Sequence, residues 1–199
     1  MDGIKGMLIQ AVELAVATYG MAGVSTRNIT EMAKVSDANI YRFFSSRDEL
    51  LYQAYAQSCG NLISMVIKNI DQLRDNHMGL HLKDCTRIIF TKIWRCLLDN
   101  PNMCKFHMYY YHSLSFEKYA MEFHEGQVKV LVEHLIWLFW NEDDAMRCIN
   151  NIFSLIYDSA KLVVDGRMPD NDDTANCVFG DIYHLLICQS SRRSFLDSK

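Results

Sequence analysis

Apolar residues recur at steps of three and four along most of the chain, which is the repeat of an α-helix with one buried face. Over residues 4–19 a single helical face carries Ile4, Leu8, Ala11, Ala15 and Tyr19. We expect Gly20 and Gly23 to end this first helix.

Two short helices are predicted next. Ser25 or Thr26 can cap the second helix, and Ser36 can cap a third, with Ile40 and Phe44 on its buried side. The apolar positions of the second helix are Ile29, Met32 and Ala33. Three helices within the first ~45 residues, the last two joined by a very short turn, are typical of a helix-turn-helix module.

The remaining pattern predicts long helices. A capping box, Ser46 to Glu49, starts a helix over about 48–75 that ends at 76–79. Further helices are expected at 82–99, 102–112, 115–140 with a bend near Gly126, 142–165 after the cap Asn141, and from 170–174 to about 190. Because no segment alternates as a strand does, the sequence predicts an all-α fold.

The composition fits this fold and excludes several classes of protein. Half of the 199 residues are hydrophobic, which excludes a disordered chain. The 20 basic and 24 acidic residues give a net charge of −4, which argues against a polybasic binder of membranes or nucleic acid. Only two prolines and nine glycines are present, so long helices meet few breakers.

Cysteine usage and the missing motifs indicate a cytoplasmic protein that is not an enzyme. The seven cysteines form no CxxC pair and read as reduced thiols. The N-terminus lacks the features of a signal peptide, and the most apolar run, 128–140, is shorter than the ~18 residues of a membrane helix. GxSxG, HExxH, Walker A and GxGxxG motifs are absent, so neither catalysis nor a cofactor is expected.

Residues 26–51, TRNITEMAKVSDANIYRFFSSRDELL, resemble the DNA-binding signature of the TetR/AcrR family of transcriptional regulators. The matching positions are Ile29, Ala33, Val35, Ser36, Ile40, Tyr41, Phe43, Phe44, Ser46, Arg47 and Leu50. The resemblance implies a helix-turn-helix domain at 1–47 and a helical effector-binding and dimerisation domain at 48–199. The helical pattern itself predicts about nine helices in all. It further implies a ligand-responsive repressor that binds a palindromic or pseudo-palindromic double-stranded operator.

A recognition helix presents its N-terminal side chains to base edges and its flanks to phosphates. Asn39 can bond adenine, Asp37 can accept from cytosine, and Arg42 can pair with guanine or phosphate. The resemblance implies phosphate contacts for Tyr41 and Arg47. The predicted DNA-binding residues are therefore Thr26, Arg27, Ser36, Asp37, Ala38, Asn39, Tyr41, Arg42 and Arg47. In the alternative interpretation, Tyr41 and Phe43 are core aromatics of a small three-helix domain.

The chain departs from the family pattern at Lys34, at Ala38 and in its N-terminal arm, and the segment before the motif, 19–24, is one residue longer than usual. Lys34 stands where the family has its turn glycine, and Ala38 replaces a second glycine. A non-glycine residue forced to positive φ costs roughly 1 kcal/mol, so we expect the turn to be tightened or reshaped. The basic N-terminal arm is reduced to Lys5, which predicts weak phosphate contact from the arm.

An excess of aromatic residues in the C-terminal part predicts a pocket for a small apolar or aromatic effector. The candidates are Trp94, Phe106, His107, Tyr110, Tyr111, Phe116, Tyr119, Phe123, Trp137 and Tyr157. The alternative is that each of these residues is ordinary core.

The last two predicted helices each carry a wide apolar stripe, which suits a four-helix contact in a homodimer. The predicted interface residues are Ile149, Ile152, Phe153, Ile156, Val178, Ile182, Leu185 and Leu186. Packing within one chain would explain the same stripes.

Two other functions remain open. One is a helical ligand-binding or interaction protein that has lost DNA binding, since Lys34, Ala38 and the reduced arm favour it. The other is a metal or redox sensor that uses the pairs His81–Cys85 and Cys104–His107. Two partial pairs do not make a four-ligand site, so no metal is predicted.

The net charge is unevenly distributed. Residues 24–47 hold four basic and two acidic side chains, a net of +2, which leaves −6 for the rest of the chain. Residues 24–47, here called the reading head, are thus mildly basic. We expect their non-specific affinity for DNA to be modest and easily screened by salt.

Overall fold

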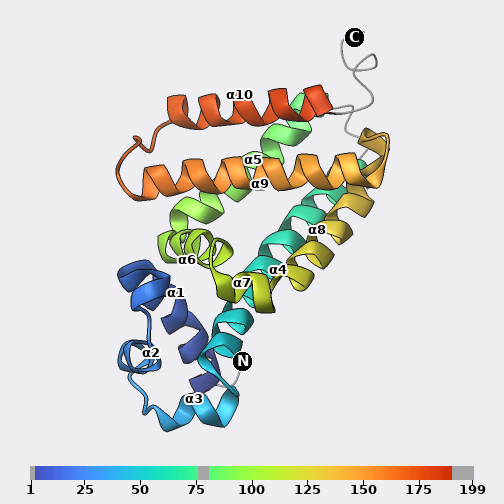
Figure 1. Ribbon diagram of the computed structural model, residues 1–199. Coiled ribbons are helices and arrows are strands. Elements are labelled where there is room, and N and C mark those ends of the chain that lie inside the picture. The colour runs from blue at the N-terminus through green and yellow to red at the C-terminus, as the bar shows by residue number, and fades with distance from the viewer. Residues whose placement is uncertain (1–2, 76–80, 190–199) are drawn as a thin grey trace. The chain divides into compact units, whose positions relative to one another are not determined.

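The computed structural model describes residues 3–75 and 81–189 (Figure 1). Within these residues every regular element is a helix, which confirms the predicted all-α fold. The chain divides into two compact units, one of residues 1–60 and 100–124 and the other of residues 61–99 and 125–199.

The first unit contains α1 (Gly3–Gly23), α2 (Thr26–Ala33), α3 (Ala38–Phe43), α6 (Pro101–Tyr111) and α7 (Leu114–Tyr119). The second unit contains α5 (Leu82–Asp99), the 3-10 helix η1 (Ile136–Leu138), α9 (Glu142–Val164) and α10 (Asp172–Gln189). Two helices, α4 (Arg47–Asp75) and α8 (Met121–Leu135), contribute residues to both units. Among the described helices, none is both long and apolar enough to span a membrane. The domain boundary expected at 47 and 48 divides the chain by role and stays a prediction.

In the first unit α1 packs against α2, α3 and α6 (Figure 1). Its buried face includes Leu8, Val12 and Val16, all completely buried. The predicted break at Gly20 is present, because this glycine takes a φ of 67°, and the helix then continues to Gly23. The buried sides of α2 and α3 are formed as predicted by the residues Ile29, Ile40 and Phe44.

The helix caps in the structure agree only in part with those predicted from the sequence. Ser25 caps α2 as predicted, since its hydroxyl accepts the backbone N–H of Asn28 at 3.2 Å. Ser36 does not cap α3, which begins at Ala38 after Asp37. At the start of α4 Ser46 accepts the N–H of Glu49 at 3.1 Å. The Glu49 carboxylate accepts from the N–H of Ser45 instead of Ser46, so only half of the predicted capping box is formed.

The turn between α2 and α3 keeps a left-handed residue at the position where the resemblance expects glycine. Lys34 has φ 55° and ψ 42°, and among the described non-glycine residues it alone has positive φ. The N–H of Lys34 donates to Glu31 O, and that of Val35 donates to Thr30 O. These two bonds form a Schellman turn, whose first residue past the helix is left-handed. The turn is therefore not reshaped at Lys34, whereas Ala38 stands at the start of α3.

We expect Lys34→Gly to stabilise the protein by about 0.5–1 kcal/mol, because glycine enters the left-handed region without the Cβ penalty. Urea unfolding of both proteins, with an unchanged m-value, measures this difference. Lys34→Ala is the matched control, since it removes the side chain and keeps the strained backbone. An equal gain from Lys34→Ala would assign the effect to the lysine side chain instead.

We expect Glu13 to make the unfolding free energy of the protein dependent on pH. This half-buried residue lies on α1, and desolvation raises the pKa of its carboxyl from 4.5 to about 7. The fold therefore favours the neutral form. The contribution of neutral Glu13 to the unfolding free energy is fully present below the unfolded pKa of 4.5 and is lost as the pH rises through about 7. We expect the unfolding free energy to fall between pH 5 and pH 8. Glu13→Gln should flatten this fall in urea unfolding across that range, and an unchanged slope would contradict the assignment.

In the second unit α9 and α10 lie side by side, and α5 packs against both (Figure 1). Asn141 caps α9 as predicted, because its side-chain oxygen accepts the N–H of Asp144 at 2.8 Å. The largest side chains that are almost completely buried in the second unit are those of Trp94 and Phe179.

The single helix predicted over 115–140 is wrong. The structure has α7, then α8, then η1, and the break between the first two falls at Ala120. Gly126, where a bend was expected, lies inside α8. Ser113 caps the start of α7, because its hydroxyl accepts from Phe116 N. The helix ends predicted at 76–79 and near 190 lie outside the described residues.

Candidate nucleic-acid interface and ligand cavity

The outer face of α3 and the turn before it presents most of the predicted base-reading side chains. Ser36, Asp37, Ala38, Tyr41 and Arg42 are exposed. Tyr41 is 66% exposed, which excludes the core role weighed for it, whereas Phe43 is half-buried.

Two of the side chains predicted to contact bases also have hydrogen-bond partners within the helix-turn-helix segment. The Asp37 carboxylate accepts a short hydrogen bond from the buried Thr30 hydroxyl, and Asn39 Nδ2 donates to Ser36 Oγ at 2.9 Å. Arg42 lies over the ring of Phe43, with 5.3 Å between the guanidinium carbon and the ring centroid. These contacts orient the polar side chains of the helix before any DNA is bound.

The predicted backbone contacts flank this face. Arg47 donates to Val24 O at 3.0 Å and lies 3.4 Å from Asp48, so it ties the start of α4 to the segment before α2. Thr26 opens α2, and Arg27 forms an exposed ion pair with Glu31 at 2.8 Å. The role of each of these residues toward DNA stays a prediction.

Half of the predicted effector residues meet in the first unit, in an aromatic cluster around Tyr55. The Tyr55 ring lies 5.0 Å from that of His107, 5.4 Å from Tyr110 and 5.3 Å from Phe116. The cluster members that the sequence singled out are Phe106, His107, Tyr110, Tyr111 and Phe116. All of them except Tyr111 are buried, so the cluster forms a close-packed core.

His107 is the polar centre of this cluster. Its Nε2 lies 2.6 Å from the Ser58 hydroxyl, and the neighbouring Tyr55 hydroxyl bonds His124 Nδ1 at 2.8 Å. Burial lowers the pKa of His107 to about 3, with a smaller effect from His124. His107 is therefore neutral near pH 7 and serves as a hydrogen-bonded core residue.

The other predicted effector residues are dispersed. Tyr119 is exposed, and Phe123 meets Tyr52 edge to face at 6.0 Å. In the second unit Trp94 stacks on Phe90 at 5.6 Å, Tyr157 is half-buried on α9, and Trp137 lines a cavity. Trp137 alone among the ten belongs to that cavity's described lining.

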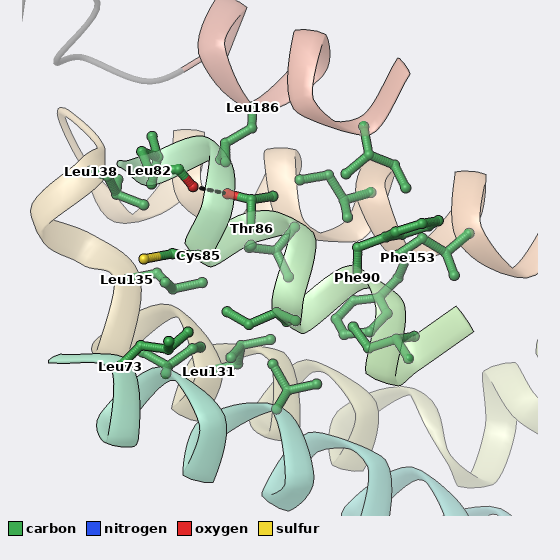
Figure 2. A pocket seen from close by; sticks show the side chains of 18 of the residues that line it. Leu73, Leu82, Cys85, Thr86, Phe90, Leu131, Leu135, Leu138, Phe153 and Leu186 are labelled. Carbon is green, nitrogen blue, oxygen red and sulfur yellow. Dashed lines mark hydrogen bonds between the residues drawn. The ribbon is translucent and has the colours of Figure 1, made fainter. Parts of the chain in front are cut away.

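The cavity lies within the second unit and has a volume of about 640 Å³ (Figure 2). Its walls come from the end of α4, from α5, α8 and η1, and from α9 and α10. The lining residues are Val66, Ile70, Leu73, Arg74, Leu82, Cys85, Thr86, Ile89, Phe90, Ile93, Leu131, Leu135, Trp137, Leu138, Ile149, Ile152, Phe153, Ile156, Ile182 and Leu186. This size is that of a small-molecule site, and the walls are mostly aliphatic.

Most of the predicted dimer residues face this cavity. Ile149, Ile152, Phe153, Ile156, Ile182 and Leu186 line it, while Val178 is buried and Leu185 is half-buried. Aliphatic residues at helical spacing look the same in a sequence whether they fill a core, an interface or a cavity wall. The lining residues on α5 were not predicted, because nothing in the sequence distinguishes them from ordinary core residues.

The described residues contain no cluster of three or more His, Cys, Asp or Glu side chains able to hold a metal ion. Cys104 and His107 are buried on α6, where His107 is bonded to Ser58. The N–H of Cys85 donates to His81 O in the first turn of α5.

Comparison with known proteins supports the resemblance of the reading head. Residues 9–54 match the model of bacterial regulatory proteins of the tetR family. This match spans most of α1, all of α2 and α3, and the start of α4. A search of curated proteins found no significant match to this chain.

Solved structures share the fold over nearly the whole chain. A TetR family transcription regulator from Marinobacter aquaeolei is 17% identical, with a TM-score of 0.74 over 92% of this chain and 95% of that one. The regulator FadR of Bacillus subtilis, in complex with stearoyl-CoA, is 15% identical, with a TM-score of 0.65 over 94% and 97%. FadR of Bacillus halodurans, a fatty acid degradation regulator, is 14% identical, with a TM-score of 0.65 over 91% and 96%.

Proposed function

We propose that this chain, a tetR family regulator by its N-terminal segment and its fold, represses transcription and leaves its operator when an apolar ligand binds. The observation that carries the proposal is the pairing of an exposed recognition helix with an aliphatic cavity in a different unit of the same chain. Neither feature alone distinguishes a regulator from a plain binding protein.

The reading head would bind double-stranded DNA through the outer face of α3. Asn39 and Asp37 would contact base edges, whereas Tyr41 and Arg47 would contact phosphates. The helix is short, and α1 packs against it, with Ile40 and Phe44 buried.

The regulator would act as a homodimer, because a palindromic operator requires two reading heads about 34 Å apart. The helices α9 and α10, which carry the predicted interface residues, would form the contact between the subunits. Ligand binding would shift the population toward a form whose two recognition helices no longer match successive major grooves.

The cavity favours a ligand with a long aliphatic chain. Its described lining is mostly Leu, Ile and Val side chains with two Phe rings and one Trp, and the remaining members are Arg74, Cys85 and Thr86. Walls of this kind can enclose methylene groups. FadR of Bacillus subtilis, similar in fold, binds stearoyl-CoA. An acyl chain of this kind is therefore the ligand class that we infer.

Selection of bound sequences from random DNA, followed by gel retardation with the selected operator, tests the proposal. We expect a palindromic consensus, and we expect long-chain acyl compounds to release the complex. If no sequence is enriched at low salt, the alternative of a binding protein that has lost DNA recognition would stand.

A further inference from the structure

The cavity of the second unit has two unlike ends. Figure 2 shows Leu73, Leu135 and Leu138 gathered at one end and Phe90 toward the other. Arg74 follows Leu73 in the last turn of α4, and its side chain is 59% exposed. Phe90 is 4% exposed, so the lining includes both a solvent-facing residue, Arg74, which marks a rim, and residues of the closed core.

The polar side chains of the cavity walls are bonded to the chain itself. The Thr86 hydroxyl donates to Leu82 O at 2.8 Å, and Trp137 Nε1 donates to His134 O at 3.2 Å. Burial raises the pKa of the Cys85 thiol above its ordinary value, which keeps that thiol neutral. A polar group of a ligand placed deep in the cavity would lose its hydration without compensation, so it belongs at the rim.

Arg74 is the charged residue in the described lining, and it is held at the rim by a small network. Its guanidinium donates to Asp71 Oδ1 at 2.9 Å, and the same oxygen lies 2.9 Å from His134 Nδ1 on α8. A guanidinium fork matches a carboxylate or a phosphate. An incoming anion would compete with Asp71 for Arg74, and His134 would remain as a partner for Asp71.

We infer that the ligand is a single-chain amphiphile whose anionic head group binds Arg74 while its aliphatic tail fills the cavity. This inference rests on the proposed function, because it names the head group of the same ligand. A free fatty acid carboxylate and a phosphate-bearing acyl thioester share this chemistry.

Three probes of equal chain length separate the head group from the tail: hexadecanoate, palmitoyl-CoA and the neutral hexadecanol. We expect at least one anion to bind the full chain about tenfold tighter than the alcohol. Arg74→Gln should lower the affinity for that anion by about 10- to 100-fold and leave the affinity for the alcohol unchanged. Arg95→Gln is the matched control, since Arg95 also pairs with an aspartate, Asp170 at 3.3 Å, and lies outside the described lining.

The two anions identify the source of the head group. Tighter binding of hexadecanoate supports a carboxylate, and tighter binding of palmitoyl-CoA supports a phosphate-bearing ester. If alcohol and anions bind equally and Arg74→Gln changes neither, the head-group inference is overturned and the proposed function stands. If none of the three probes binds, both the inference and the proposed acyl ligand fail.

Discussion

Ile89→Trp is expected to abolish the response to ligand while operator binding remains. Ile89 is half-buried on α5 and lines the cavity, so an indole at this position occupies space that the aliphatic chain would fill. Displacing on the order of four methylene groups, at about 0.8 kcal/mol each, corresponds to about 200-fold weaker binding. The variant would therefore stay on its operator at ligand concentrations that release the unaltered protein.

The neighbouring residue provides a matched control. Ile88 is the same residue type on the same helix and is also half-buried, but it is outside the described lining. Ile88→Trp should keep ligand binding in calorimetric titrations and release in gel retardation. Equal loss in both variants would point to general disturbance of α5, and full response of Ile89→Trp would place the effector elsewhere.

The reading head could be predicted from the sequence to a large extent because its signals are local. Serine at a helix start, short helical runs and buried positions such as Ile29 and Ile40 specify α2 and α3 from neighbouring residues alone. Lys34 shows the limit of such reasoning. The two backbone hydrogen bonds of the turn hold this residue left-handed, although its Cβ opposes that conformation.

The residues that line the cavity could not be predicted from the sequence. Aliphatic residues have the same helical spacing in a cavity wall as in a packed core. Ile152 and Ile156 follow the same spacing that a dimer seam requires, and tertiary packing alone decides that they border empty space. The placement of the predicted aromatic residues has a related physical reason. Large rings such as Phe106 and Tyr110 fill volume well, so the chain uses them in a packed cluster and leaves aliphatic side chains around the cavity.

Tyr41→Ala combined with Arg42→Ala is expected to lower operator affinity by at least about 100-fold without unfolding the protein. Each lost base or phosphate contact costs roughly 1–3 kcal/mol, and a dimer loses both contacts twice. Tyr41 is 66% exposed and Arg42 is exposed, so substitution at these positions should change the unfolding free energy by no more than about 0.5–1 kcal/mol.

A matched pair exists in the same unit. Lys118 lies over the ring of Tyr119 at 5.0 Å, and both are exposed on α7. Lys118→Ala with Tyr119→Ala removes the same charge and a similar aromatic surface away from α3. We expect this control to bind the operator almost normally in gel retardation over a range of salt concentrations. Equal losses from the two double variants would mean that net charge, and not the face of α3, carries DNA binding. A loss confined to α3, with a salt slope reduced by the missing phosphate contacts, would locate recognition on the short helix that Ile40 and Phe44 anchor.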